Sequence, residues 1–271
     1  MIEFHNLKKW ARGLCLPAAV IFTPIGQGYA QMIFEEDFES AELDLTKWKY
    51  HLDGNTALVD IVDTTARSGS RSAHMKTVAA NGDRRAEIVP KFPRFVWGEE
   101  YWVGFSLMVH TPVEKAGAVH QHHSVPNNNN WDCGAGPNSF TIQARDDVDL
   151  LMRTATNPEY IEAVPKSNSA LGNSVPTPVA YLPDEWTDIV YHFRYAPDET
   201  GFFQIWVDGE MVLDHQGPTV YRIDYCGKPK VQEQYMKIGL YPAAKGGDGE
   251  IYYDELRVAG ALSSYADVAP R

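Results

Sequence analysis

The sequence predicts an all-β fold, an antiparallel sandwich or jelly roll. Aromatic, aliphatic and polar residues alternate in several short segments, which is the pattern of half-buried β-strands. Clusters of glycine, proline and aspartate separate these segments at the short intervals typical of such sandwiches. The sequence contains no helical pattern of four turns, no internal repeat and no evident interdomain linker.

Six segments along the chain are the clearest expected strands. They are Tyr101 to His110, Phe140 to Arg145, Ile189 to Tyr195, Phe202 to Val207, Tyr235 to Tyr241 and Ile251 to Val258. A Pro-Asp-Glu-Thr-Gly turn at 197–201 predicts that the third and fourth strands form a hairpin. Asn127 to Pro137 and Pro158 to Pro183 are expected to be long loops, which on a β scaffold often serve binding.

Residues 1–30 are expected to be a signal peptide. A basic segment at 8–12 precedes an apolar run at 14–22, and small residues then lead to a cleavage site before Gln31. The alternative is a membrane anchor, but the run is shorter than the roughly 20 residues that span a bilayer. We therefore expect a secreted or periplasmic protein whose residues 31–271 form a single β domain.

The charge of the chain excludes several classes of partner. Cleavage would remove three of the 24 basic and one of the 36 acidic residues, leaving 21 and 35 and a formal charge of −14. Such a protein does not bind nucleic acid or an anionic membrane non-specifically. It can act on a polyanion only through a local basic cleft. We expect a monomer.

Cys133 and Cys226 remain after cleavage. In an oxidising compartment they can form a disulfide, which would contribute about 4–5 kcal/mol in the chain-entropy model. Two unrelated thiols are the alternative, and the sequence leaves both open.

The segment from Tyr235 to Tyr241 carries an unusual polar face. Alternation places Tyr235, Lys237 and Tyr241 together on a face that we expect to be solvent-facing. Gly239 lies between them, and we interpret it as a gap through which a ligand approaches the backbone. The other residues face the core: Met236, Ile238 and Leu240.

Two further segments carry polar side chains at strand spacing. Gln121 and His123 share one face, whereas His120 and His122 point the other way and are candidates for a zinc site. Arg85 and Glu87 share a face at residues 85–88, so that the carboxylate can orient the guanidinium. An ordinary surface ion pair is the alternative reading of that pair.

Together these segments resemble the polysaccharide lyases with a β-jelly-roll fold. The motifs are Arg-Ala-Glu-Ile at 85–88, Gln-x-His at 121–123 and Tyr-x-Lys-x-Gly-x-Tyr at 235–241. The layout is similar to the heparin lyase I and glucuronan lyase (polysaccharide lyase family 20) branch from about residue 33 to 258. Jelly-roll alginate lyases share the motifs in related form, but Pro242-Ala243 replaces their polar pair, which weakens alginate as a substrate.

The resemblance implies a concanavalin A-like sandwich with a concave cleft that cleaves a uronic-acid polysaccharide by β-elimination. Glucuronan is the first choice, and alginate or a heparin-type glycan are alternatives. Arg85 and Gln121 would neutralise the substrate carboxylate. Tyr241 would donate the proton and, in a syn elimination, also act as base. His123 would be the base in an anti elimination, or otherwise a neutralising group.

Other residues are expected to bind substrate, and no cofactor is required for the chemistry. Lys237 is a tuning or binding charge, and Tyr235 is a subsite or packing residue. Arg145 would add to the basic cleft, with a solvated arginine as the alternative. Trp131 would stack on a sugar ring or form a structural lid.

The acidic segment from Glu35 to Glu39 leaves other functions open. Glu35 and Glu39 match the carboxylate pattern of jelly-roll glycoside hydrolases, although such motifs lie on mid-chain strands. In related jelly rolls, acidic residues of the first and last strands hold a structural calcium ion, and Glu39 with Asp254 could do so here. A non-catalytic carbohydrate-binding domain is the third class.

Overall fold

The computed structural model describes most of the chain beyond residue 30. The described residues are 31–92, 94–112, 117–125, 138–145, 149–155, 160–162, 174–220, 222–225, 228–230, 233–241 and 248–271. Residues 1–30, Trp131, Cys133 and Cys226 lie outside them, so the expected signal peptide, sugar-stacking tryptophan and disulfide stay predictions. Within the described part of the chain, no helix is long and apolar enough to cross a membrane.

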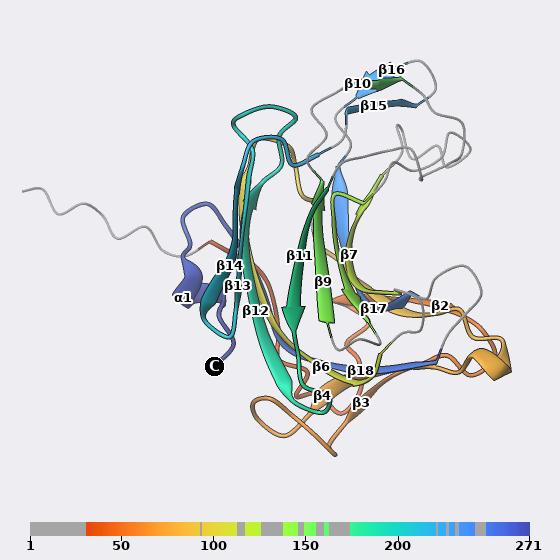
Figure 1. The fold of residues 1–271 in the computed structure, drawn as a ribbon. Coiled ribbons are helices and arrows are strands. Elements are labelled where there is room, and N and C mark those ends of the chain that lie inside the picture. The colour runs from red at the N-terminus through yellow and green to blue at the C-terminus, as the bar shows by residue number, and fades with distance from the viewer. Residues whose placement is uncertain are drawn as a thin grey trace, which may run out of the picture.

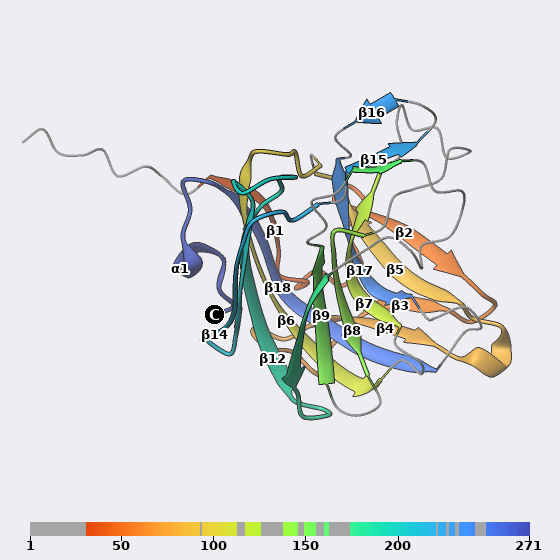
Figure 2. The same ribbon diagram turned by 45° about the horizontal axis from the view of Figure 1, so that its top comes forward.

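Two antiparallel sheets pack face to face as a jelly-roll sandwich (Figures 1 and 2). The first sheet runs in the order β14 (Glu210–Gln216), β13 (Phe202–Val207), β12 (Trp186–Arg194), β6 (Glu100–Thr111), β18 (Gly249–Gly260), β4 (Ser72–Thr77), β3 (Leu58–Val62), with β1 (Met32–Glu36) beside β18. The second runs in the order β11 (Ser174–Ala180), β9 (Asp149–Ala155), β8 (Phe140–Ala144), β7 (Ala118–Ser124), β17 (Gln234–Tyr241), β5 (Arg85–Pro90), β2 (Trp48–Asp53).

Smaller elements lie around the sandwich. The short strands β10 (Tyr160–Glu162), β15 (Arg222–Tyr225) and β16 (Lys228–Lys230) form a separate sheet beyond one end of the second sheet (Figure 1). The 3-10 turn η1 (Ala79–Asn81) follows β4, and helix α1 (Tyr265–Val268) packs on the outer side of the first sheet against β6, β12 and β18.

The core lies between the two sheets and is rich in aromatic rings. Fully buried side chains come from both sheets, among them Trp48, Phe105, Phe140, Tyr191 and Tyr253. Alternation along each strand supplies one inward side chain in two, so burial of these large rings is the main stabilising contribution. The predicted all-β jelly roll is confirmed.

Every one of the six expected strands is present, and the expected hairpin is formed by β12 and β13. The prediction that Pro158 to Pro183 form one long loop is wrong, because this range contains β10 and the seven-residue strand β11. Pro176 and Pro178 lie within β11, although proline is disfavoured in the interior of a sheet. They are tolerated because β11 is the edge of its sheet and pairs only with β9, so their missing N–H groups face away from the ladder.

Candidate active site

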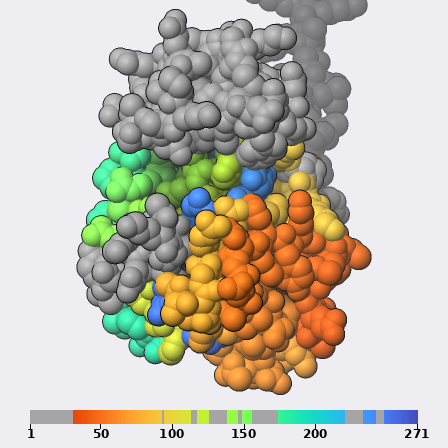
Figure 3. Space-filling view, turned by 90° about the vertical axis from the view of Figure 1, so that its right-hand side faces the viewer, coloured from red at the N-terminus to blue at the C-terminus, as the bar shows by residue number. Residues whose placement is uncertain are grey.

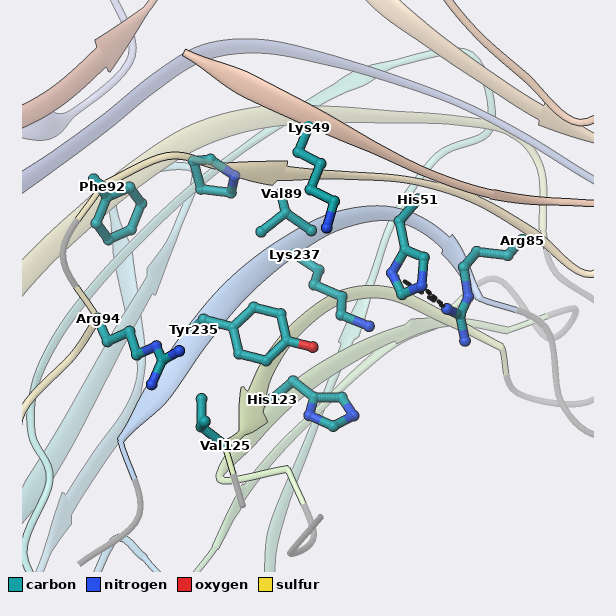
Figure 4. Close-up of a pocket in the computed structure, with 11 residues that line it drawn as sticks. Lys49, His51, Arg85, Val89, Phe92, Arg94, His123, Val125, Tyr235 and Lys237 are labelled. Carbon is teal, nitrogen blue, oxygen red and sulfur yellow. Dashed lines mark hydrogen bonds between the residues drawn. The ribbon is translucent and has the colours of Figure 1, made fainter. Parts of the chain in front are cut away.

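A cavity of about 690 Å³ opens on the face of the second sheet that is turned away from the core (Figure 4). Four neighbouring strands, β2, β5, β17 and β7, supply most of its lining. In the space-filling view, blue atoms of the chain near residue 240 lie between orange N-terminal strands and green mid-chain strands (Figure 3). The lining residues are Lys49, His51, Arg85, Val89, Pro90, Phe92, Arg94, His123, Val125, Tyr235 and Lys237.

One buried carboxylate, that of Glu87, lies beneath the polar side chains of this face. Its Oε1 accepts a hydrogen bond from the amide nitrogen of Gln121. Its Oε2 lies 3.2 Å from Nε of Arg85 and 3.6 Å from Nζ of Lys237. Burial raises the pKa of Glu87, and the positive charges of Lys237 and Arg85 act in the opposite direction. The predicted Arg85–Glu87 contact is confirmed, but the carboxylate serves three residues rather than one.

The Arg85 guanidinium is held from three sides. Glu87 contacts its Nε, the neutral ring of His51 accepts a hydrogen bond from its Nη1, and the Tyr241 ring lies under its Cζ at 4.7 Å. A planar guanidinium clamped in this way presents its remaining edge in a defined direction.

The prediction that the polar face of β17 is exposed to solvent is wrong at Lys237. Its side chain is only 3% exposed, because the ammonium reaches down to Glu87. Burial lowers the pKa of Lys237, while the Glu87 carboxylate opposes that change. Its Nζ also lies 5.5 Å from the centre of the Tyr235 ring. The apolar side of the strand is as predicted: Met236, Ile238 and Leu240 are buried.

Gln121 is buried and both ends of its amide are engaged. The nitrogen donates to Glu87, and the oxygen accepts a hydrogen bond of 2.7 Å from Nδ2 of Asn138. Because Gln121 pairs with Lys237 across β7 and β17, the two side chains lie over the same carboxylate.

His123 is a neutral imidazole with a defined tautomer. Burial, reinforced by the Lys237 charge, lowers its pKa to about 4. Its Nδ1 lies 2.8 Å from the carbonyl oxygen of Ser124, a group that only accepts hydrogen bonds. Nδ1 therefore carries the proton and Nε2 carries the basic lone pair. This arrangement suits proton abstraction and not hydrogen-bond donation to a carboxylate.

The two tyrosines of β17 occupy opposite ends of the site. Tyr235 pairs with His123, their ring centres lie 5.3 Å apart, and burial raises the pKa of Tyr235 to about 12. Tyr241 lies at the far end of the strand, 41% exposed and against Arg85. Of the two, only Tyr235 lines the cavity.

His51 and Lys49 also line the cavity, although neither was predicted from the sequence to be a site residue. Both lie on β2, which pairs with β5 and brings His51 opposite Glu87. Burial and the neighbouring charges of Lys237 and Arg85 lower the pKa of His51 to about 4. The only feature of the sequence that could have indicated their role is that Lys49 and His51 are two residues apart on a short strand and so share a face.

Arg145 is not among the residues that line the cavity. It follows β8 directly, its backbone N–H donates to the backbone carbonyl of Asp149, and its own backbone carbonyl accepts a hydrogen bond from the Tyr181 hydroxyl. The predicted contribution of Arg145 to the basic cleft is therefore not seen in the described part of the site.

Gly239 does not leave a gap for a ligand, which corrects the sequence interpretation. A Cβ at this position would lie 2.3 Å from the carbonyl oxygen of Ala86 and 2.8 Å from the sulfur of Met75. Its φ of +117° also disfavours L side chains. Glycine is required because β5 approaches closely, at the point where the pairing of β17 with β7 shifts register.

His120 and His122 are core residues and not an exposed pair of zinc ligands. Both are fully buried, and both bind the hydroxyl of Tyr191 through Nε2, at 2.9 and 2.7 Å. Nδ1 of His122 also binds the hydroxyl of Tyr195. Among the described residues, no three His, Cys, Asp or Glu side chains are placed to hold a metal ion.

The carboxylates considered for calcium or hydrolysis lie on the first sheet or beside it, away from the cavity. Glu39 accepts hydrogen bonds from the N–H groups of Ser70 and Arg71 and from the Ser70 hydroxyl. Asp254 accepts three from backbone N–H groups, including those of Arg67 and Ser68. No third His, Cys, Asp or Glu side chain joins these two carboxylates among the described residues, and the calcium site stays a prediction.

Glu35 and Glu36 are likewise engaged. Glu35 binds Nε of Arg257 at 2.9 Å, and the buried Glu36 accepts hydrogen bonds from the Trp48 indole and from the N–H of Phe38. Neither is among the residues that line the cavity, and no acidic residue is found in that lining within the described part of the chain.

Comparison with known protein families identifies relatives of this chain. The family model described as polysaccharide lyase matches residues 40–257. No curated protein matches the sequence.

Solved structures share the fold at low identity. An endo-beta-1,4-glucuronan lyase from the fungus Trichoderma reesei is 20% identical, with a TM-score of 0.66 over 88% of this chain and 98% of that one. A marine PL-14 alginate lyase from Aplysia kurodai is 12% identical, with a TM-score of 0.54 over 86% and 100%. A Family 7 alginate lyase in complex with substrate is 15% identical, with a TM-score of 0.52 over 83% and 99%.

Proposed function

The chain belongs to the polysaccharide lyase family, and from this premise we propose that it cleaves a β-linked polyglucuronate by β-elimination. The observation that carries the proposal is the clamped Arg85 guanidinium, which lies over the Tyr241 ring and lines the same cavity as His123. The fold likeness to a glucuronan lyase supports this choice of substrate over alginate.

The charge of the cavity suits an anionic polymer. Four of its lining residues are cationic side chains, Lys49, Arg85, Arg94 and Lys237, whereas none is acidic. Arg94 is paired with Glu233 at 2.7 Å, and Glu87 offsets part of the remaining charge from below. The local excess of positive charge attracts a polyuronate in spite of the net charge of −12 for the whole chain.

For the elimination to begin, the C5 proton of the sugar must become more acidic. The adjacent carboxylate is already negative, so the carbanion that forms on removing this proton is strongly disfavoured. The free edge of Arg85 donates to the substrate carboxylate and stabilises the charge that builds up on it. A fixed donor costs no reorganisation when the charge develops.

Two proton transfers complete the reaction. We assign the C5 proton to Nε2 of His123, because that nitrogen holds the lone pair. Tyr241 gives its proton to the bridging oxygen as the C4–O bond breaks and the C4=C5 double bond forms. The alternative, in which Tyr241 performs both transfers in a syn elimination, requires no base at His123.

A substrate panel tests the proposal. The protein is incubated with glucuronan, alginate, heparin and hyaluronan, and the ultraviolet absorbance of the new double bond is followed. We expect the highest kcat/KM on glucuronan. New reducing ends without absorbance would show hydrolysis instead, and binding without either product would show a carbohydrate-binding domain.

A matched pair of tyrosine variants guards against a contaminating lyase. Tyr241→Phe should abolish the absorbance change. Tyr252→Phe, on the outer face of the first sheet where its hydroxyl contacts Glu250, should leave it intact.

Export through residues 1–30 is part of the same proposal. Amino-terminal sequencing of protein recovered from outside the cytoplasm should begin at Gln31. Recovery of the intact amino terminus in the cytoplasm alone would contradict it.

A further inference from the structure

Glu87 is central to the polar cluster of the site but is not among the residues that line the cavity. Its side chain is 1% exposed and lies under Lys237 and Arg85. Its Oε2 is buried without a hydrogen-bond partner in the described structure, so its contacts with the two cations are electrostatic. A carboxylate in this position acts on the reaction only through its neighbours.

The first neighbour is Lys237, whose burial depends on the carboxylate. Its side chain is 3% exposed, and among the described residues Glu87 is the only anionic group in contact with its ammonium. Removing one partner of a buried ion pair leaves the other charge uncompensated, which is strongly unfavourable. Without Glu87 the ammonium would either lose its proton or leave the floor of the cavity.

The second neighbour is Arg85, which links the carboxylate to the proton donor. Glu87 and His51 hold two edges of the guanidinium, and the face of that group lies over Tyr241. A guanidinium free to rotate would misplace the donor edge that meets the substrate and would release the Tyr241 ring.

The third neighbour is Gln121, whose amide orientation follows from the same contact. With Oε1 of Glu87 accepting from the amide nitrogen, the amide oxygen must face Asn138. A glutamine at position 87 would place a second amide against the first and remove this preference.

We propose that Glu87 is a positioning residue of the elimination: it fixes Arg85, Gln121 and Lys237 from below and never contacts the sugar. The inference rests on the proposed function for its kinetic consequence. Its structural part, the dependence of Lys237 on Glu87, stands independently of any substrate.

The experiment compares Glu87→Gln with Glu36→Gln. Glu36 is a matched control because it is also a buried carboxylate with a nearby cation, Lys47 at 3.4 Å, but belongs to β1. For each variant, kcat and KM are measured across pH, thermal unfolding is recorded, and the Lys237 ammonium is titrated by NMR.

We expect Glu87→Gln to lower kcat about 100-fold, the scale on which a misplacement of about 1 Å acts. KM should change less, the pH profile should shift, and the Lys237 ammonium should titrate at lower pH than in the wild type. Glu36→Gln should lower the Tm but leave kcat, KM and the Lys237 titration unchanged.

A second variant keeps the proposal falsifiable if Glu87→Gln folds poorly. Glu87→Gln/Lys237→Met removes both charges and should recover the Tm without recovering kcat, since Arg85 stays unclamped. A Glu87→Gln protein that keeps wild-type kcat and pH profile would overturn the positioning role. If the wild type forms no double bond on any polyuronate, the proposed function fails, while the Lys237 titration still decides whether Glu87 governs that side chain.

Discussion

The two faces of β7 use histidine in opposite ways. On the core face, His120 and His122 lie among aromatic rings and bind tyrosine hydroxyls. On the other face, His123 lies beside Lys237 and a cavity. All three pKa values are lowered, to about 3 for His120 and about 4 for His123, and burial is the first cause in each case.

A neutral imidazole is therefore not by itself a sign of a functional site. The surroundings decide its role: phenols in a closed core make it a structural hydrogen-bonding group, whereas an open cavity makes it accessible to a ligand, as the proposed base role of His123 requires. A shift of a single position along a strand exchanges these environments. Variants matched across the two faces test this distinction.

The largest contrast is expected between two tyrosines. Tyr241→Phe should lower kcat by about 10²–10⁴-fold, the usual contribution of a positioned proton donor, and leave stability unchanged. Tyr191→Phe should leave kcat unchanged but lower the free energy of unfolding by about 1–3 kcal/mol, because buried imidazole nitrogens lose their partner. Absorbance assays and urea denaturation measure the two quantities. Full activity in Tyr241→Phe would remove it as the proton donor.

The next contrast is between adjacent histidines. His123→Asn should lower kcat about 100-fold or more, since the base is lost while a donor to Ser124 is kept. His122→Phe should instead lower the free energy of unfolding by about 1–3 kcal/mol, because the hydroxyls of Tyr191 and Tyr195 lose a partner. If His123→Asn kept its activity, Tyr241 would perform both proton transfers.

Because of the core histidines, the free energy of unfolding should decrease in acid. Their pKa values lie below the ordinary value of 6.5, so from pH 6.5 downward the unfolded chain binds protons that the folded core does not. Stability should fall as the pH is lowered, by about 1.4 kcal/mol per pH unit for each histidine. Urea denaturation between pH 7.5 and 5 measures the slope, and His122→Phe should reduce it. An identical slope in that variant would assign the acid sensitivity to other groups.

Metal removal should have the smallest effect. The histidines of the core are closed off, and the carboxylates of Glu39 and Asp254 already accept N–H donors. We expect the same Tm with a chelator as with added calcium or zinc. A lower Tm under chelation would instead support the structural calcium ion predicted from the sequence.

The alternation of residues along single strands was sufficient to predict part of this site. Alternation correctly assigned the buried side of β17 and the opposed faces of His122 and His123, because side-chain direction in a strand depends only on parity. The same rule paired Arg85 with Glu87 across two residues of one strand.

The rest depended on which strands become neighbours. Glu87 meets Lys237 and Gln121, and His51 meets Arg85, only because β2, β5, β17 and β7 lie side by side in the sheet. The sequence order of these strands does not predict that arrangement. Gly239 was misread for the same reason: the backbone that crowds it belongs to β5.

The two prolines of β11 have a consequence for the behaviour of the protein in concentrated solution. Pro176 and Pro178 leave the outer rim of that strand without two of its N–H groups, so a strand from another molecule cannot complete a regular ladder there. The opposite rim, β2, carries Lys49, His51 and Asp53. Both edges of the second sheet are thus protected from pairing with a strand of another molecule, which opposes the growth of insoluble fibrils from that sheet.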